Sequence, residues 1–166
     1  PHMIPKLFST LVPKDRLKLE VQVGEEAFGV PIAGGLAYEP PAEEAQQVAA
    51  VKTETTVPLI RLALARSGDK GDHANIGVIA RKAEYLPYLR AALTREAVRD
   101  YFAHVLAAGA QGRVERWELP GTDSMNFLLF HALGNGGAAR LRTDPPGKWF
   151  GQMLLEFPVP VPQHLA

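Results

Sequence analysis

Four residues capable of acid–base or ligand chemistry lie close together in one polar segment. Residues 65–81 read ARSGDKGDHANIGVIAR, and within five positions they place two carboxylates, an ammonium group and an imidazole, from Asp69, Lys70, Asp72 and His73. Oxygen and nitrogen atoms at this spacing can coordinate a divalent cation, and an imidazole can act as a base. Alternatively, the aspartates bond nearby backbone amides and the glycines adopt positive φ, which makes a structural turn. The spacing matches no known metal loop, so we expect the turn and no metal.

The same segment has the composition of an anion-binding nest. Backbone amides of residues 67–71 can cradle an anion together with the ammonium group of Lys70. The spacing differs from that of a Walker loop, and a strand rather than a helix is predicted to follow. Ser67 has no acid–base partner nearby in the sequence and no nucleophile elbow, so a hydrolase is not indicated. The ligand-binding candidates of this segment are Ser67, Asp69, Lys70, Asp72, His73 and Asn75.

Further candidates come from the second half of the chain. His131 ends a predicted strand and would meet the Asp69–His73 loop if the two strands are neighbours, although a strand-end histidine is ordinarily packed and hydrogen-bonded. Gly136 belongs to a glycine-rich turn that would let backbone approach a ligand, and Arg140 could pair with a carboxylate or phosphate. A plain hairpin turn is the alternative interpretation. The sequence identifies no catalytic residue and no cofactor.

The elements that must position these residues follow from hydrophobic periodicity. Apolar alternation predicts strands at 59–64 and 76–80, which form a hairpin around the charged loop. Two helices against one face of an antiparallel sheet is the simplest packing, which gives a two-layer α+β sandwich of ferredoxin-like type. The other expected elements are helices at 84–93 and 95–108 (capped by Thr94 and ended by Gly109), strands at 114–119 and 125–133, an edge strand at 138–142, a helix from Pro145 to Phe157 (capped by Asp144) and an extended tail at 159–166.

The chain before this domain has a different character. Residues 1–3 resemble a protease-cleavage and cloning scar, and residues 4–33 form a predicted β-hairpin extension. Its alternating apolar residues indicate a half-buried strand, turned back at residues 24–26. Residues 34–56 are rich in Pro, Ala, Glu and Gln and form a predicted linker with one or two helical turns. The α+β domain is expected to occupy residues 57–166.

Composition excludes several classes of protein. The 18 basic residues are balanced by 18 acidic ones, so no basic field indicates nucleic-acid binding. With no cysteine there is no disulfide or thiolate site, which fits a cytoplasmic protein. No apolar run approaches the ~20 residues of a membrane span, and the N-terminus lacks the pattern of a signal peptide. A free sheet edge with Trp117, Trp149 and Phe150 predicts a homo-oligomer.

Three segments resemble the C-terminal domain of the acyclic terpene utilisation protein A (AtuA) family. They are residues 65–81, 126–137 and 141–155, and the resemblance covers roughly Pro58 to Val159. The sequence departs from the family pattern at Asn135, Arg140 and Pro146. The resemblance implies a ferredoxin-like fold that normally follows a much larger N-terminal domain. It also implies a role in the breakdown of acyclic terpenes and related branched acids through CoA thioesters.

Two functional interpretations follow. In the first, the chain is a non-catalytic accessory or assembly domain, whose Ser67–His73 loop contributes to a site for an anionic ligand such as an acyl-CoA or a carboxylate. Its partners would then be the larger N-terminal domain and further copies of itself. In the second, the chain is a stand-alone small-molecule or metal-binding module, or a small enzyme, using Asp69, Lys70, Asp72 and His73.

Overall fold

The computed structural model describes residues 10–32, 34–37, 52–106, 109–134 and 143–166. The chain divides into two compact units, one of residues 7–46 and one formed mainly by residues 47–166, and each is treated by itself. Three of the predicted features lie outside the described residues: the candidates Gly136 and Arg140, the edge strand at 138–142 and the helical turns near residue 45.

The smaller unit contains the predicted hairpin. Strand β1 (Leu19–Val23) pairs antiparallel with β2 (Glu26–Val30) after a short 3-10 turn (Lys14–Arg16), and Gly24 makes the connection at a φ of +63°. The hairpin is therefore confirmed. The expectation that its strand is half-buried is wrong, because every residue of both strands is exposed. The described part of this unit has no second layer against which an apolar face could be buried.

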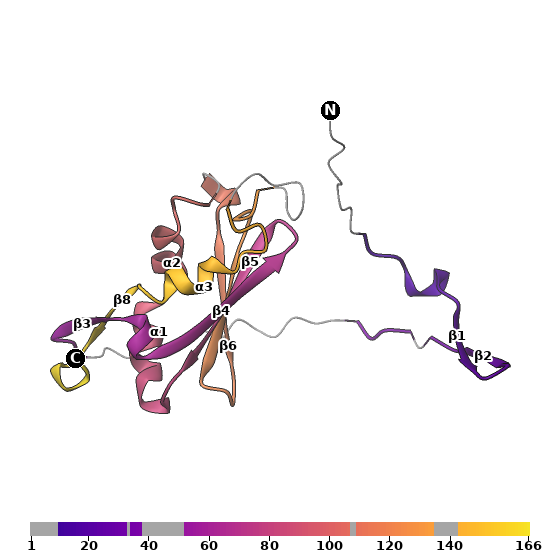
Figure 1. The fold of residues 1–166 in the computed structure, drawn as a ribbon, viewed down its shortest axis with the longest axis horizontal. Coiled ribbons are helices and arrows are strands. Elements are labelled where there is room, and N and C mark those ends of the chain that lie inside the picture. The colour runs from indigo at the N-terminus through magenta and orange to yellow at the C-terminus, as the bar shows by residue number, and fades with distance from the viewer. Residues whose placement is uncertain (1–9, 33, 38–51, 107–108, 135–142) are drawn as a thin grey trace. The chain divides into compact units, whose positions relative to one another are not determined.

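The larger unit is built on a four-stranded antiparallel sheet with the strand order β4-β5-β7-β6. The strands are β4 (Ala63–Lys70), β5 (His73–Ala80), β6 (Val114–Leu119) and β7 (Ser124–Leu129). Helix α3 (Trp149–Leu154) packs on β4 and β5, and α2 (Arg95–Tyr101) packs on β6, with α1 (Leu86–Ala92) preceding it (Figure 1). This arrangement is an α+β sandwich of ferredoxin-like type, as predicted. In the described ranges, every helix is too short or too polar to cross a bilayer.

The larger unit also contains a second sheet, which has two strands. Strand β3 (Thr55–Pro58) pairs antiparallel with β8 (Pro158–Val161). The predicted linker therefore ends before Thr55, and the C-terminal segment is not an isolated tail. Val57, Val159 and Val161 are buried, while the alternating positions, including Pro160, are exposed. The prolines thus occupy outward positions in a short pair of strands, where a missing amide donor is tolerated.

Local geometry corrects several predicted boundaries. Residues 59–61 form a 3-10 turn before β4, whereas the sequence predicts that they are the first half of a strand at 59–64. The hairpin loop contains only Gly71 and Asp72, because β4 continues to Lys70 and β5 begins at His73. The φ of Gly71 is +66°, a value that suits the first central position of a tight two-residue turn. Most of the residues expected in a polar loop therefore belong to strands.

Two helix boundaries also differ from the prediction. Helix α2 begins after the predicted cap, since the Thr94 hydroxyl accepts from the amide of Ala97, but it ends at Tyr101 and not at Gly109. Helix α3 begins at Trp149 and not at Pro145. The left-handed φ angles of Asp144 (+64°) and Gly147 (+63°) prevent an α-helix from starting earlier.

The two faces of the four-stranded sheet differ in their side chains. The face that carries the helices, called the covered face below, is apolar and buried, with Ala74, Ile76 and Val78 on β5 and Met125, Phe127 and Leu129 on β7. The opposite face is called the open face. From register, its side chains run in cross-strand rows: Leu64–Ile79–Ser124–Leu119, Arg66–Gly77–Asn126–Trp117, Gly68–Asn75–Leu128–Glu115, and Lys70–His73 followed by Phe130 and Arg113.

Candidate functional site

The candidate residues gather at one end of the sheet, around the β4–β5 turn. Lys70 and His73 are register partners on either side of that turn. The segment after β7 lies against it, because the amide of Leu133 donates to the carbonyl oxygen of Asp72 at 3.0 Å. The pairing of Ala74 with Leu129 brings the end of β7 to the start of β5. His131 therefore lies close to Asp72 and His73. The sequence predicts this contact only if the two strands are neighbours, and β5 and β7 are neighbours.

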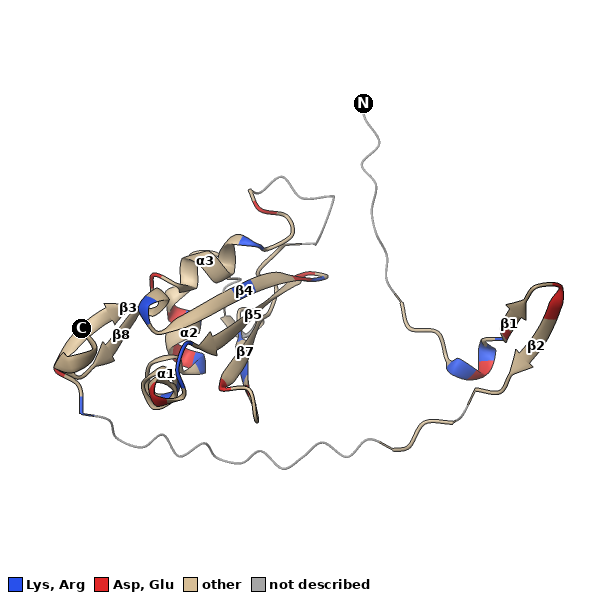
Figure 2. Ribbon diagram, turned by 60° about the horizontal axis from the view of Figure 1, so that its bottom comes forward, with Lys and Arg blue, Asp and Glu red and all other residues tan. Residues whose placement is uncertain are grey.

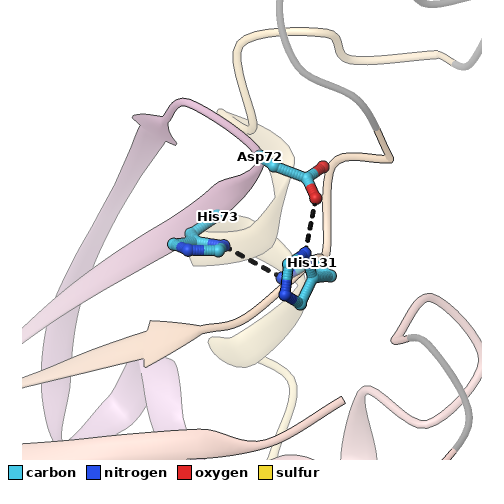
Figure 3. Close-up of side chains that lie close together, drawn as sticks. All are labelled: Asp72, His73 and His131. Atoms are coloured by element: carbon cyan, nitrogen blue, oxygen red, sulfur yellow. Dashed lines mark hydrogen bonds and ion pairs between the residues drawn. The ribbon is translucent and has the colours of Figure 1, made fainter. Parts of the chain in front are cut away.

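Asp72 and His131 form a close carboxylate–imidazole pair (Figure 3). The distance between Oδ2 of Asp72 and Nδ1 of His131 is 2.6 Å, and the two side chains are 29% and 46% exposed. A carboxylate at Nδ1 selects the tautomer with the proton on that nitrogen when the imidazole is neutral. The remaining nitrogen, Nε2, is then unprotonated.

His73 completes the cluster from the first position of β5. Its Nδ1 accepts a hydrogen bond from the backbone amide of His131 at 3.1 Å, and the rings of the two histidines meet edge to face at 4.9 Å (Figure 3). Partial burial lowers the pKa of His73 below its usual value. The charges of His131 and Arg113 act in the same direction, and Asp72 opposes them. Neutral His73 is the form whose Nδ1 can accept the hydrogen bond from the amide of His131.

The backbone at His131 adopts an uncommon conformation. Its φ is +50°, in the left-handed region that residues other than glycine seldom occupy, although histidine tolerates it better than most. This conformation turns the chain after β7 so that the amide faces His73 while the imidazole faces Asp72. The two contacts together fix both histidines at the sheet end.

This cluster has the donor atoms of a metal site. One ligand atom from each of Asp72, His73 and His131 lies within 4.8 Å of the others. Two imidazole nitrogens and a carboxylate oxygen are a ligand set found for zinc and for other divalent transition metals. The same three groups can instead transfer a proton, because His131 is paired with a carboxylate and is accessible to solvent.

A second cluster lies on the open face, one cross-strand row further along the hairpin. Nζ of Lys70 donates to Oδ1 of Asn75 at 3.1 Å, and Nδ2 of Asn75 donates to Oδ1 of Asn126 at 3.4 Å. Nζ of Lys148 also lies there, because a Cβ built on Gly68 would be 3.0 Å from it and 3.8 Å from Oδ1 of Asn75. Lys148 thus reaches around the edge strand β4. We call Lys70, Lys148, Asn75 and Asn126 the cationic cluster.

The ammonium groups of the cationic cluster have no acidic partner in the part of the chain that the structure describes. Ion pairs within 4.0 Å engage other basic residues there, such as Arg90 and Arg116, but neither Lys70 nor Lys148. Figure 2 shows basic ribbon at the start of α3, and acidic as well as basic ribbon at the tip of the β4–β5 hairpin. Two cations that lie near the same asparagine side chain, neither of them in a described ion pair, favour an anionic ligand.

Ser67 has a structural environment. It is 5% exposed and lies on the covered face, where its hydroxyl donates to the carbonyl of Gly147 at 2.6 Å and accepts from the amide of Gly151 at 2.8 Å. A Cβ on Gly151 would lie 3.1 Å from the backbone of Arg66 and Ser67, so the backbones of α3 and β4 are in close contact at this glycine. The Ser-Gly pair therefore serves helix packing, with its hydroxyl already bonded.

The structure separates the candidates into groups. It brings Asp72, His73 and His131 together and places Lys70 beside Asn75, while Ser67 faces α3. Asp69 pairs with Ala74 and is exposed; its backbone oxygen accepts from Nζ of Lys70. Sequence reasoning missed Lys148, Asn126, and the pair in which the Arg113 guanidinium lies 3.9 Å from the Phe130 ring. Only Asn126 has a signal in the sequence that could have identified it, namely a polar side chain in an otherwise apolar central strand.

Comparison with curated proteins and with solved structures finds no match for this chain. A family model does match, over residues 57–160, which include β4, β5, β6 and β7 and the helices α1, α2 and α3. The matched range contains both clusters at the sheet end. The chain belongs to the AtuA ferredoxin-like domain family.

Proposed function

We propose that this chain is an accessory domain of an AtuA-type protein that takes part in the catabolism of acyclic terpenes or related branched acids as CoA thioesters. In this role it holds the anionic part of a ligand, a carboxylate or a CoA phosphate, on the open face of its sheet. Membership of the family supports the setting, and the cationic cluster supports the site.

One observation carries the ligand proposal: two ammonium groups lie near one site, and neither has an acidic partner in the part of the chain that the structure describes. Placing Lys148 Nζ and Lys70 Nζ near the same amide oxygen costs electrostatic free energy unless an anion compensates. Gly68 leaves the space above the sheet that Lys148 occupies. Asn75 and Asn126 add amide groups that can orient a carboxylate or a phosphate.

The experiment is a titration of the protein with coenzyme A, with a branched short-chain acyl-CoA and with the corresponding free acid. We expect Lys148→Ala to weaken binding by about 1.5–3 kcal/mol, the range for a charge-assisted hydrogen bond, which is about 10- to 150-fold in Kd. Gly68→Ala should weaken it as well, because the new methyl group displaces Nζ of Lys148. Lys82→Ala is the matched control, since Lys82 is exposed and paired with Glu84 away from the cluster.

Binding of all three probes that is unchanged in Lys148→Ala and Gly68→Ala would refute the site. Coenzyme A and the free acid separate the two ligand chemistries, because only the former carries phosphates. The accessory role predicts in addition that this chain alone shows no steady turnover of a branched acyl-CoA. Sustained turnover would favour the alternative of a stand-alone small enzyme.

Self-association is part of the same proposal. The edge strands β4 and β6 are free in the described unit, and Trp117 and Trp149 are 47% and 59% exposed, whereas Phe150 is buried and cannot contribute. An unpaired sheet edge beside exposed apolar side chains favours pairing between copies. Light scattering across micromolar concentrations should therefore give a mass above that of one chain, and a constant single-chain mass would contradict this.

A further inference from the structure

We propose that Asp72, His73 and His131 bind a divalent transition-metal ion, of which zinc is the representative. The site is separate from the cationic cluster, and the proposal does not depend on any anionic ligand. It also differs from a metal loop within residues 69–73, because its third ligand, His131, comes from the segment that follows β7.

The geometry places three donors around one point. The ligand atoms lie within 4.8 Å of one another, and donors bound to one zinc ion at about 2.0–2.2 Å lie roughly 3–3.5 Å apart. Asp72 and His131 are at present closer than that, at 2.6 Å, so they must separate slightly to admit an ion. The side chains of Asp72 and His131 are 29% and 46% exposed and do not belong to the buried core, so this movement does not disturb it.

The backbone of the cluster is held in place although its side chains can move. The bond from the Leu133 amide to the Asp72 carbonyl ties the segment after β7 to the hairpin turn. His73 lies against Phe130, with ring centroids 4.7 Å apart, which orients its imidazole. A site whose ligands come from two tied chain segments loses less conformational entropy on binding than one assembled from a flexible loop.

The ion would replace existing hydrogen bonds. Nδ1 of His73 accepts from the His131 amide, and Nδ1 of His131 is bonded to the Asp72 carboxylate. Coordination through these nitrogens breaks both bonds, but the freed His131 amide is at an exposed residue and can bond water. Imidazole nitrogens are good ligands for zinc, cobalt and nickel and poor ones for calcium or magnesium. The donor set therefore predicts a selective site.

The charged groups nearby determine the affinity of the site for a metal ion, and the number of protein donors determines how many coordination positions stay open. Asp72 is the acidic member of this three-residue cluster in the described ranges, while Lys70 precedes the turn and Arg113 lies over Phe130. These cations lower the affinity for a metal ion and raise it for an anionic ligand of the bound metal. Three protein donors leave at least one coordination position open, as in zinc sites that carry an exchangeable water.

The test is calorimetric titration of the full chain with zinc, with magnesium as the negative control, together with the visible absorption spectrum after cobalt addition. All proteins carry His2→Ala, because an N-terminal histidine is a competing ligand. We expect one zinc ion per chain and a cobalt spectrum of low symmetry. His131→Asn should weaken zinc binding at least 100-fold, since asparagine tolerates positive φ but is a poor zinc ligand.

Matched controls distinguish the site from surface histidines. His104→Asn and His164→Asn remove exposed histidines outside the cluster and should leave the zinc affinity unchanged. Asp72→Asn keeps a hydrogen-bond acceptor for His131 but removes the charge, and should weaken binding at least tenfold. Circular dichroism of each metal-free variant verifies its fold, and His73→Gln gives a second ligand variant if His131→Asn does not fold. The proposal is overturned if zinc does not bind, or if folded variants at residues 73 and 131 bind it as tightly as the parent.

Discussion

The two faces of the four-stranded sheet differ in how their polar groups are satisfied. On the covered face, Ser67 is bonded to the backbone of the segment leading into α3, and Arg116 donates to the carbonyls of Arg90 and Leu93 and pairs with Glu118. On the open face, the ammonium group of Lys70 donates to neutral oxygen atoms, and neither Lys70 nor Lys148 forms an ion pair within 4.0 Å among the described residues.

This difference separates stability from ligand binding within one sheet. A buried polar group without a partner costs folding free energy, and on the covered face the Ser67 hydroxyl and the terminal nitrogens of Arg116 have partners, although Nε of Arg116 is buried without one. Exposed cations without an acidic partner add little to folding, and they remain available to a ligand. Substitutions on the two faces should therefore separate loss of stability from loss of binding.

The largest expected effect is on the covered face, in the middle of β7. Phe127 is 0% exposed, and Phe127→Ala removes most of its packing and leaves a cavity, which costs about 3–5 kcal/mol of unfolding free energy. Asn126→Ala is the matched control, because its side chain faces the open side of the same strand and should change stability far less. Urea denaturation measures both variants. Equal losses in the two would contradict the assignment of the faces.

The next effect concerns the contact between β4 and α3. Ser67→Ala leaves the buried amide of Gly151 and the carbonyl of Gly147 without their partner, and we expect a loss of about 1–3 kcal/mol. Ser124→Ala is the control, since among the described residues its hydroxyl bonds to that of the exposed Thr122 and to no buried backbone group. If Ser67→Ala lowered ligand affinity without lowering the melting temperature, Ser67 would belong to the binding site and not to the covered face.

Elements governed by local patterns were predictable from the sequence. The alternation of residues 114–119 gave the bounds of β6, and Thr94 marked the start of α2, because strand periodicity and helix capping depend on neighbouring residues. The apolar run at 59–64 was misassigned for the same reason. Leu59 is buried through its contacts in a 3-10 turn, and a short apolar run does not distinguish a turn from a strand.

The candidate site was predictable only where strand pairing determines it. His131 could be placed near Asp72 on the condition that β5 and β7 are neighbours, and they are. Lys148 could not be placed, because its position depends on how the segment before α3 crosses the edge of β4. That crossing relies on Gly68, Gly147 and Gly151, which leave space for close approach but do not specify a partner. The sequence of the polar segment also predicts a loop where the structure has strands, because these strands are rich in residues that usually favour turns.

A smaller effect is expected at the edge of the covered face, at Tyr101. Its hydroxyl donates to the carbonyl of Met153 at 2.9 Å, so Tyr101→Phe should cost about 1 kcal/mol. Burial raises the pKa of Tyr101, and the nearby Glu156 adds to this. The folded state therefore holds the proton more tightly, and this contribution is complete below a pH of about 10 and is lost as the pH rises through the folded-state pKa.

Denaturation of the parent and of Tyr101→Phe between neutral and alkaline pH measures both parts of this prediction. The stability difference between them should shrink as the pH rises above the ordinary tyrosine pKa. Tyr88→Phe is the control, because Tyr88 is likewise partly buried against the core. A stability difference between the parent and Tyr101→Phe that stayed constant through the alkaline range would show that Tyr101 ionises equally in both states.

The smallest effect on stability should come from the open face, and its sign is informative. Lys148→Gln removes one of two neighbouring ammonium groups without removing an ion pair, so the free energy of unfolding should change by no more than about 0.5 kcal/mol. Because the two cations repel each other, the variant should be slightly more stable than the parent at low ionic strength, and the difference should vanish as salt screens the repulsion.

Inorganic phosphate should raise the melting temperature of the parent more than that of Lys148→Gln, since a ligand that binds the folded state stabilises it. Lys82→Gln, which breaks an exposed pair with Glu84, should show neither the gain at low salt nor the altered phosphate response. A clear loss of stability in Lys148→Gln would mean that this lysine supports the fold, and the open face would then share the structural role of the covered face.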